Sequence, residues 1–281
     1  MASQLVNDCL IDIFEYLEDE KDQGSLRSCL FVNRHWCGVA VRFLWKRVRN
    51  YKTLVACLPQ ESKEILHENG ITLPPTLKPP SFNYVAFIKG LSADRLIEEV
   101  RKIQPIDSQG LDNDERMMVL REIFKMVMAQ AALKTLDLYF CTNSVPAFFS
   151  IATFLRKIPF PSFSGAGDCL RNLSELHCDS DVPPEFFHHM SQTCRRLQRL
   201  SVFREYKRGV STGLSDLITN QRKLTHLYVG DGQVSLLLRD ILMAFADCQS
   251  NARECRCYTT PLESQWHLGY RLQRHRGRWS E

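Results

Sequence analysis

The stretch CLFVNRHWCGVAVRFLW, residues 29–45, is denser in apolar side chains than one amphipathic helix face requires. Within it, Trp36, Val39, Ala40, Phe43 and Leu44 follow the i, i+3, i+4, i+7, i+8 spacing of a helix. An earlier run has the same spacing and predicts a preceding helix: Leu10, Ile13, Phe14 and Leu17. A helical module this small cannot cover so much apolar surface, so we expect part of it to face a partner.

The order of these residues resembles the F-box. The matching elements are Phe14-x-x-Leu17, then Cys29-x-x-Val32-x-Arg34-x-Trp36, and a closing Leu44-Trp45. The motif usually opens with Leu-Pro, and this chain departs from it with Leu5-Val6. Two later segments, LPQESKEILHENGI (58–71) and PPSFNYVAF (79–87), resemble the continuation seen in F-box families of filamentous fungi.

This resemblance implies a module that binds a Skp-type adaptor and, through it, a cullin. It also implies that the chain is a non-catalytic subunit, the substrate-recognition adaptor of an SCF-type (Skp–cullin–F-box) E3 ubiquitin ligase with an unknown protein target. The residues carried over to Skp binding are Leu5, Leu10, Ile13, Phe14, Leu26, Cys29, Val32, Trp36, Leu44 and Trp45. Some of them must form the core of the module. We expect Trp36 and Val39 inside, and Leu5 and Leu10 at the interface.

Length and composition bound the remaining possibilities. The 281 residues, 44% of them hydrophobic, favour two domains with a large core. No apolar run is long enough to span a bilayer, so no membrane association is expected. Asp8 and Asp12 and the lack of a basic start argue against a signal peptide, which favours a cytoplasmic or nuclear location. The eleven cysteines include no Cys-x-x-Cys pair and are expected to be buried thiols.

Proline clusters divide the chain after the first module. The stretch ITLPPTLKPPSFNY (71–84) cannot be helical and predicts an extended strap, whereas residues 91–104 have the spacing of a short helix. The expected division has four parts: an F-box module at 1–50, a helical and proline-rich linker at 51–110, a leucine-rich-repeat-like region at 111–246, and a poorly ordered basic tail at 247–281.

A Leu-x-x-Leu-x-Leu unit recurs after predicted helices. Its instances are Leu133–Leu136–Leu138, a looser Leu170–Leu173–Leu176, Leu197–Leu200–Val202 and Leu224–Leu227–Val229. The last three centres have the separation typical of leucine-rich repeats, whereas the first step is too long for one repeat. The expected fold class is therefore a mixed α+β, or α/β, solenoid in which the three-helix module precedes a short, irregular leucine-rich-repeat array. The alternative is a mixed α/β domain with coincidental spacing.

Catalytic and ligand-binding motifs are absent from the sequence. It has no phosphate-binding glycine loop, no nucleophile elbow and no His-Glu-x-x-His helix, so no enzyme activity and no cofactor are expected. His188 and His189 are adjacent on a predicted helix and diverge too far to share a metal ion. No base accompanies Cys57 or Cys194. A zinc site is a remote alternative, and its ligands would be Cys255, Cys257, His267 and His275.

The formal net charge of +4 comes mostly from the C-terminal tail. Residues 253–281 contain three more arginines than glutamates and no lysine. No basic stripe precedes the tail, so nucleic acid is not an expected partner. Two alternatives to the ligase adaptor stay open: a protein-interaction scaffold that does not act in ubiquitination, and a nucleic-acid-associated protein that uses the arginine-rich tail.

Overall fold

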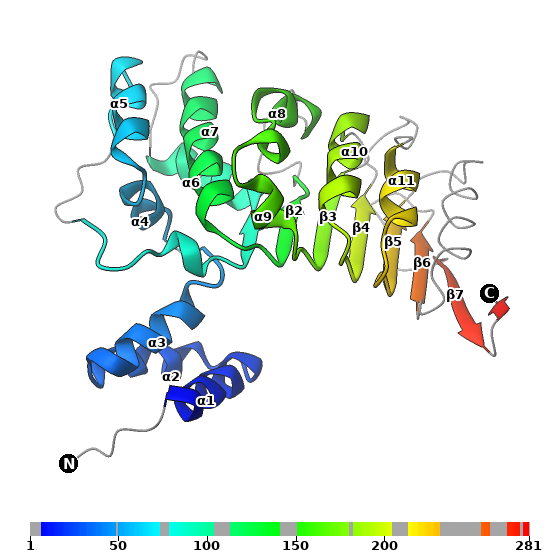
Figure 1. Ribbon diagram of the computed structural model, residues 1–281, viewed down its shortest axis with the longest axis horizontal. Helices are drawn as coiled ribbons and strands as arrows, with labels where there is room; N and C mark the ends of the chain where they lie inside the picture. Colours follow the sequence, from blue (N-terminus) through cyan, green and yellow to red (C-terminus); the bar gives the residue numbers. More distant parts are fainter. Residues whose placement is uncertain are drawn as a thin grey trace.

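The computed structural model has a helical N-terminal region beside a longer unit of helices and strands (Figure 1). The structure describes residues 7–48, 50–73, 79–103, 113–140, 151–179, 182–203, 213–230, 254–258, 269–275 and 278–280. No helix in these ranges is long and apolar enough to cross a membrane.

The N-terminal region is a three-helix module with its own core. It contains α1 (Asn7–Asp19), α2 (Gln23–Ser28), the 3₁₀ turn η1 (Cys29–Phe31) and α3 (Arg34–Leu44). The side chain of Asp22 caps α2 by accepting from the amide of Ser25, and the side chain of Asn33 caps α3 by accepting from the amide of Trp36. The core contains Leu10, Phe14, Leu26, Cys29, Val39, Ala40 and Leu44.

The region expected as a helical and proline-rich linker contains helices, and the structure describes its residues 51–73 and 79–103. They form α4 (Tyr51–Ala56), α5 (Gln60–Glu68), the 3₁₀ turn η2 (Val85–Phe87), β1 (Gly90–Ser92) and α6 (Ala93–Ile103). Their apolar side chains, from Leu54 to Val100, belong to the same core as the strands that follow. The expected helix over 91–104 is present as α6, but its first residues belong to a strand.

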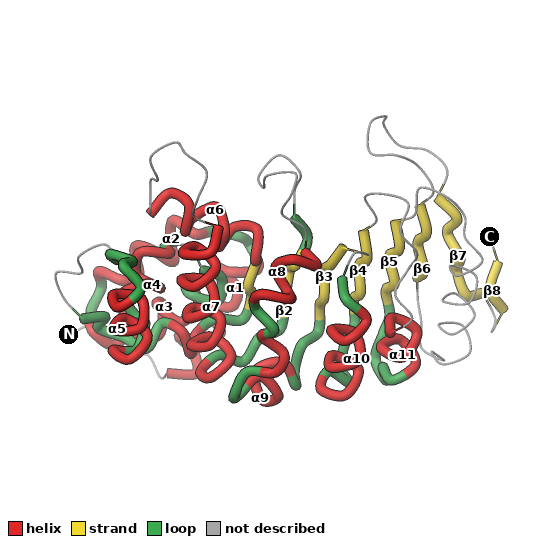
Figure 2. Tube along the Cα trace, turned by 90° about the horizontal axis from the view of Figure 1, so that it is seen from above, coloured by secondary structure: helices red, strands yellow, loops and turns green. Residues whose placement is uncertain are grey.

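The sheet has eight strands in chain order, and the first six are parallel. The strands are β1, β2 (Thr135–Leu138), β3 (Glu175–Asp179), β4 (Arg199–Phe203), β5 (His226–Gly230), β6 (Glu254–Tyr258), and the antiparallel β7 (Gly269–His275) and β8 (Arg278–Ser280). The helices between them are α7 (Asn113–Gln130), α8 (Ile151–Lys157), α9 (Ala166–Leu170), α10 (Pro184–Thr193) and α11 (Gly213–Thr219), with a 3₁₀ turn η3 (Phe160–Ser162). Figure 2 shows α10 and α11 along one side of the strands.

The strands pair in the register that the leucine spacing predicts. Leu136, Leu176, Leu200 and Leu227 are aligned across β2 to β5 and are buried. The looser second unit is shifted, because Cys178 pairs with Leu138 and Val202 and so occupies the last apolar position. The unit is therefore Leu173–Leu176–Cys178, in which a thiol takes the place of an aliphatic side chain.

Buried polar side chains join neighbouring strand–helix units. The thiol of Cys194 donates to the carbonyl oxygen of Leu170 at 3.3 Å. In the next unit, the buried amide of Gln221 donates to the carbonyl oxygen of Cys194 at 2.6 Å and accepts from the amide of Leu197 at 3.0 Å. These bonds satisfy backbone groups at the helix-to-strand turns, where regular secondary structure leaves them unpaired.

The C-terminal tail differs from its expected description. β6 continues the parallel sheet from β5, and β7 and β8 add an antiparallel edge. The structure does not describe the side chains of the arginines between residues 253 and 278. The four residues of the alternative zinc site lie in the same tail, and the structure does not describe their side chains.

Candidate partner-binding surfaces

The core of the N-terminal module is built around one phenylalanine. The ring of Phe14 packs edge-on against Trp36 at 5.7 Å and Phe43 at 5.8 Å, measured between centroids. Leu10 and Leu26 are fully buried beside it. This packing favours one orientation of α1 against α3, because aromatic edge-to-face pairs add specific geometry to apolar burial.

Most residues that the sequence assigned to partner binding lie inside the module. Phe14, Leu26, Cys29 and Leu44 are buried, and Trp36 and Trp45 are half-buried. Leu10 was expected at the surface, and that prediction is wrong because its side chain is fully buried. Val39 is buried, as expected. Leu5 lies outside the described residues. Of the assigned set, the exposed members are Ile13 and Val32.

Large apolar side chains are nevertheless exposed on this module. Phe31 is 88% exposed, Tyr16 65%, Val32 55% and Ile13 39%. In the rest of the described chain, the other exposed large apolar side chain is Ile65, at 40%. The module therefore carries most of the large exposed apolar side chains, and their contact with water is unfavourable. We call Ile13, Tyr16, Phe31 and Val32 the exposed apolar set.

Sequence reasoning missed the two most exposed members of this set. Tyr16 lies two positions from Phe14 on α1, and side chains at i and i+2 point to different sides of a helix. Phe31 ends η1, two residues before Asn33, the extended residue that caps α3. The signal available in the sequence was a bulky apolar residue at a position outside both helical stripes.

A short junction ties the module to the rest of the chain. Trp45 packs against the cores of both parts, and its ring contacts that of Tyr84 in a tilted arrangement with a centroid distance of 4.5 Å. The carbonyl oxygen of Lys46 accepts from the amides of Lys89 and Gly90 at 2.7 and 2.8 Å. The ammonium of Lys46 also pairs with the carboxylate of Glu18. The module is therefore held by apolar packing, backbone hydrogen bonds and an ion pair.

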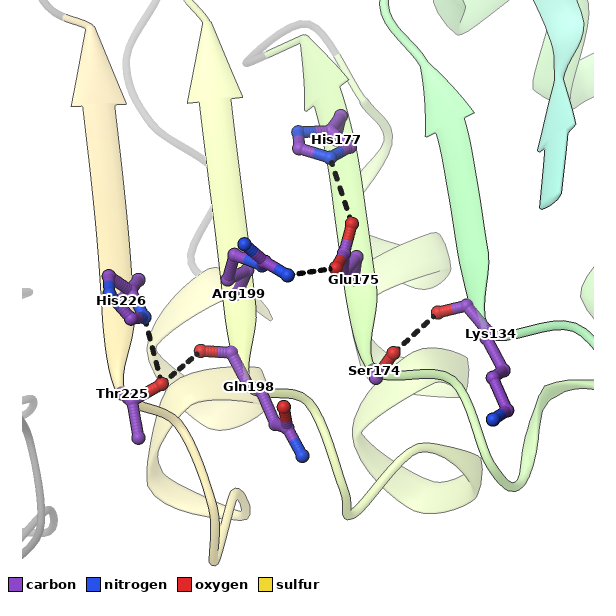
Figure 3. Close-up of polar contacts among 8 residues, drawn as sticks. All are labelled: Lys134, Ser174, Glu175, His177, Gln198, Arg199, Thr225 and His226. Carbon is purple, nitrogen blue, oxygen red and sulfur yellow. Dashed lines mark hydrogen bonds and ion pairs between the residues drawn. The ribbon is translucent and has the colours of Figure 1, made fainter. Parts of the chain in front are cut away.

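The second surface is the sheet face opposite α10 and α11. Side chains alternate along each strand, so the residues between the buried leucines point to this open face. One row across the strands contains Glu175 and Arg199, whose ion pair measures 2.5 Å (Figure 3). His177 lies 4.0 Å from the same carboxylate, and His226 contacts the hydroxyl of Thr225 at 2.9 Å.

An aromatic strip crosses the open face at the C-terminal ends of the strands. It consists of Tyr139 after β2, Phe203 on β4 and Tyr228 on β5. The centroid of the Phe203 ring lies 4.7 Å from that of Tyr139 and 5.1 Å from that of Tyr228. All three rings are half-buried, so each keeps part of its surface in contact with solvent.

The cysteines whose side chains the structure describes show no nucleophilic site. Cys29, Cys169, Cys178 and Cys194 are free and buried, as expected, whereas Cys37 and Cys57 are half-buried and the expectation is wrong for Cys9, which is exposed. Burial raises the pKa of the Cys169 thiol to about 11 and that of Cys194 to about 12. Burial also raises the pKa of Cys57. Such thiols stay protonated and unreactive at neutral pH.

The adjacent histidines of α10 make contacts within their own helix. His189 Nδ1 lies 2.7 Å from the carbonyl oxygen of Glu185, and His188 Nε2 lies 2.9 Å from the side-chain nitrogen of Gln192. Both histidines are exposed. Within the described ranges, no cluster of three metal-ligating side chains occurs.

A family model described as F-box-like matches residues 7–51, which are the three-helix module and the first residue of α4. No curated protein matches the chain. F-box-like domains are typically non-catalytic adaptors that generally bind a Skp-type partner, so the match suggests that the module is a protein-interaction adaptor.

Proposed function

Because residues 7–51 are similar to the F-box-like family, we propose that this chain is the substrate-recognition adaptor of an SCF-type ubiquitin ligase. One observation supports the proposal most directly: the exposed apolar set is concentrated on the F-box-like module. Interface hot spots are apolar or aromatic side chains that lose contact with water on binding. In this proposal, the exposed apolar set contacts a Skp-type adaptor. The complex would form in the cytoplasm or the nucleus.

The strand–helix units would then bind the target protein as a short leucine-rich-repeat-like array. Such arrays stack a strand on one face and a helix on the other, and stacking buries the aliphatic side chains between units. The aligned row of Leu136, Leu176, Leu200 and Leu227 supports this assignment. The open face would present variable polar and aromatic side chains to the target.

The chemistry would be performed by other subunits of the ligase. This chain would contribute proximity, which raises the effective concentration of a target lysine near the ubiquitin-charged enzyme. The junction supports this role, because Trp45 and Lys46 fix the module against the sheet-bearing unit. A rigid adaptor loses less of the effective concentration than a flexible tether does.

A pull-down with a purified Skp-type adaptor tests the interface. The test variant is Phe31→Asp with Val32→Asp, because both side chains are exposed and their replacement leaves the core intact. The control is Ile65→Asp, which places one such charge at an exposed apolar position on α5. We expect binding to fall more than about tenfold for the double variant and to be unchanged for the control.

Retained binding of the double variant would refute the assignment of this surface. Leu10→Asp is unsuitable for the test, because a charge at that fully buried position would unfold the module. Co-purification of a cullin with the tagged wild-type chain then distinguishes the ligase adaptor from the scaffold alternative. Skp binding without a cullin would support the scaffold.

A further inference from the structure

Strands β2 to β5 begin along one continuous edge of the sheet. The carbonyl oxygen of Lys134, just before β2, accepts from the amide of Ser174 at 2.8 Å. The carbonyl oxygen of Ser174 accepts from the amide of Gln198 at 2.8 Å, and that of Gln198 accepts from the amide of Thr225 at 2.9 Å. These four residues lie at the lower ends of the strands in Figure 3. Each unit therefore enters its strand directly beside the preceding unit.

Positively charged side chains recur at this edge from one unit to the next. The residue four positions before the strand is an arginine in three successive units: Arg171 before β3, Arg195 before β4 and Arg222 before β5. In the last two units a second cation follows directly, as Arg196 and Lys223, and all five side chains are exposed. No basic stripe is visible along the sequence before the tail, but strand register brings together cations that are distant in the chain.

Most of this positive charge has no counter-charge within the described chain. Arg171 pairs with Asp168 at 2.6 Å, and Arg199 at the start of β4 pairs with Glu175 at 2.5 Å. Arg196 donates to the neutral side-chain oxygen of Asn172 at 3.1 Å. Five exposed cations at this edge form no ion pair with a described residue, and we call them the basic edge: Lys134, Arg195, Arg196, Arg222 and Lys223.

The fold itself requires fewer cations than the basic edge contains. The C-terminal end of a helix carries partial negative charge, which a nearby cation stabilises. However, α10 and α11 are each followed by an adjacent pair, Arg195-Arg196 and Arg222-Lys223. Neighbouring strands are about 4.8 Å apart, which is shorter than the Debye length at physiological salt, so the cations of successive units repel one another. An anionic partner would relieve this repulsion.

The surroundings of the basic edge favour the carboxylates of a polypeptide over nucleic acid. Single-stranded nucleic acid is generally held by aromatic rings beside the cations, and the aromatic strip lies at the opposite ends of the strands. The carboxylates of Asp168 and Glu175 lie next to the edge and would repel a continuous polyanion. An acidic polypeptide can place an uncharged residue at these points, and its carboxylates match the fork of an arginine guanidinium.

We propose that the basic edge docks an extended acidic segment of a partner protein, whose glutamate or aspartate carboxylates pair with the cations of successive units. This surface is separate from the exposed apolar set and from the open face of the sheet. The inference therefore goes beyond the proposed function, and its test requires no Skp-type adaptor.

The probe is a rhodamine-labelled peptide of alternating glycine and glutamate, and the assay is fluorescence anisotropy with the full chain at low ionic strength. The same peptide with glutamine in place of glutamate keeps the shape and removes the charge. We expect the glutamine peptide to bind more than about fivefold more weakly. Binding of the glutamate peptide should also weaken as salt is added, because exposed charges are screened.

Paired variants distinguish a local site from the net charge of the whole chain, since a charge of +4 attracts any acidic peptide. Arg195→Gln with Arg222→Gln removes two charges from the basic edge and should weaken binding about fivefold. The matched control is Arg121→Gln with Arg156→Gln, which removes the same charge from exposed positions on α7 and α8 and should leave binding nearly unchanged. Circular dichroism verifies that each variant is folded.

A second variant of the basic edge, Lys134→Gln with Lys223→Gln, should weaken binding by a similar factor. The proposal is overturned by any of these results: no measurable binding of the glutamate peptide, equal binding of the glutamine peptide, unchanged binding by either edge variant, or equal weakening by the arginine variant and its control. Tighter binding of a labelled single-stranded oligonucleotide than of the glutamate peptide would also overturn it. Each of these outcomes leaves the Skp pull-down unaffected, so a failure of this inference is distinguishable from a failure of the proposed function.

Discussion

Replacing Gly165 by alanine should destabilise the sheet-bearing unit more than its exposed position suggests. Gly165 is the N-cap residue of α9 and has φ 83° and ψ −11°, in the left-handed region. A side chain there costs about 1–2 kcal/mol relative to glycine. An alanine Cβ would also lie 2.7 Å from the carbonyl oxygen of Met128 and 2.9 Å from the Cα atom of Ala129. These backbone atoms of α7 cannot rotate away.

The two effects give the expected magnitude. Forcing extra volume into a packed contact costs about 1–3 kcal/mol, so the total loss in the free energy of unfolding is about 2–5 kcal/mol. For a fold of this size, that loss corresponds to a fall in Tm of roughly 5–15 °C. The close approach of Gly165 to α7 also affects the sheet. The backbone carbonyl oxygen of Cys169 in α9 accepts from the amide of Leu133, just before β2.

Gly167→Ala is the internal control for this prediction. Gly167 lies in the same short helix, and its added Cβ would meet no atom within 4 Å. Alanine has the higher helix propensity, so this variant should gain up to about 1 kcal/mol. Urea unfolding followed by circular dichroism measures both variants. If Gly165→Ala and Gly167→Ala unfolded at the same urea concentration, the close approach of α9 to α7 would be refuted.

Three further predictions concern individual side chains. At pH 8, a thiol reagent should label exposed Cys9 in the native protein but leave Cys194, with its pKa raised to about 12, unlabelled until denaturant is added; rapid native labelling of Cys194 would contradict its burial. Asn33→Ala removes the cap of α3 and should cost about 1 kcal/mol in urea unfolding, whereas no change would mean that the cap is unimportant. Ser62→Ala removes a 2.8 Å hydrogen bond to the buried carboxylate of Glu122 and should cost about 1–3 kcal/mol by the same measurement; a stabilised variant would exclude a structural role for this bond.

The leucine pattern predicted the strands well because it depends on local geometry. Leu136, Leu200 and Leu227 each lie two positions before the last apolar residue of their unit. Side chains two positions apart on a strand point to the same face, so this spacing predicts a buried face. The same reasoning misaligned the second unit. It assigned Leu170 as the first residue of the unit and did not include Cys178, which occupies the last apolar position. β1 was missed because three residues beginning with Gly90 carry no alternation that a sequence pattern can reveal.

The candidate surfaces were less predictable than the fold. Helical spacing placed Leu10 and Ile13 on one apolar stripe, but only the packing of α1 against α3 makes the first fully buried and leaves the second at the margin. The aromatic strip brings together Tyr139, Phe203 and Tyr228 from separate units. Its members become neighbours only through strand register, a long-range property that no local window of sequence contains.

The shared packing of Trp45 decides where this chain can be divided. A fragment that ends at Tyr51, like the F-box-like match, would separate Trp45 from Tyr84 and the Lys46 carbonyl from both of its donors. Transplanting the adaptor-binding part onto another recognition unit therefore requires more than residues 7–51, because α4 to α6 and β1 share one core with the strands that follow. Evolutionary exchange of target specificity in such a chain would occur by replacing later strand–helix units, since a crossover just after the module would break the core on both sides.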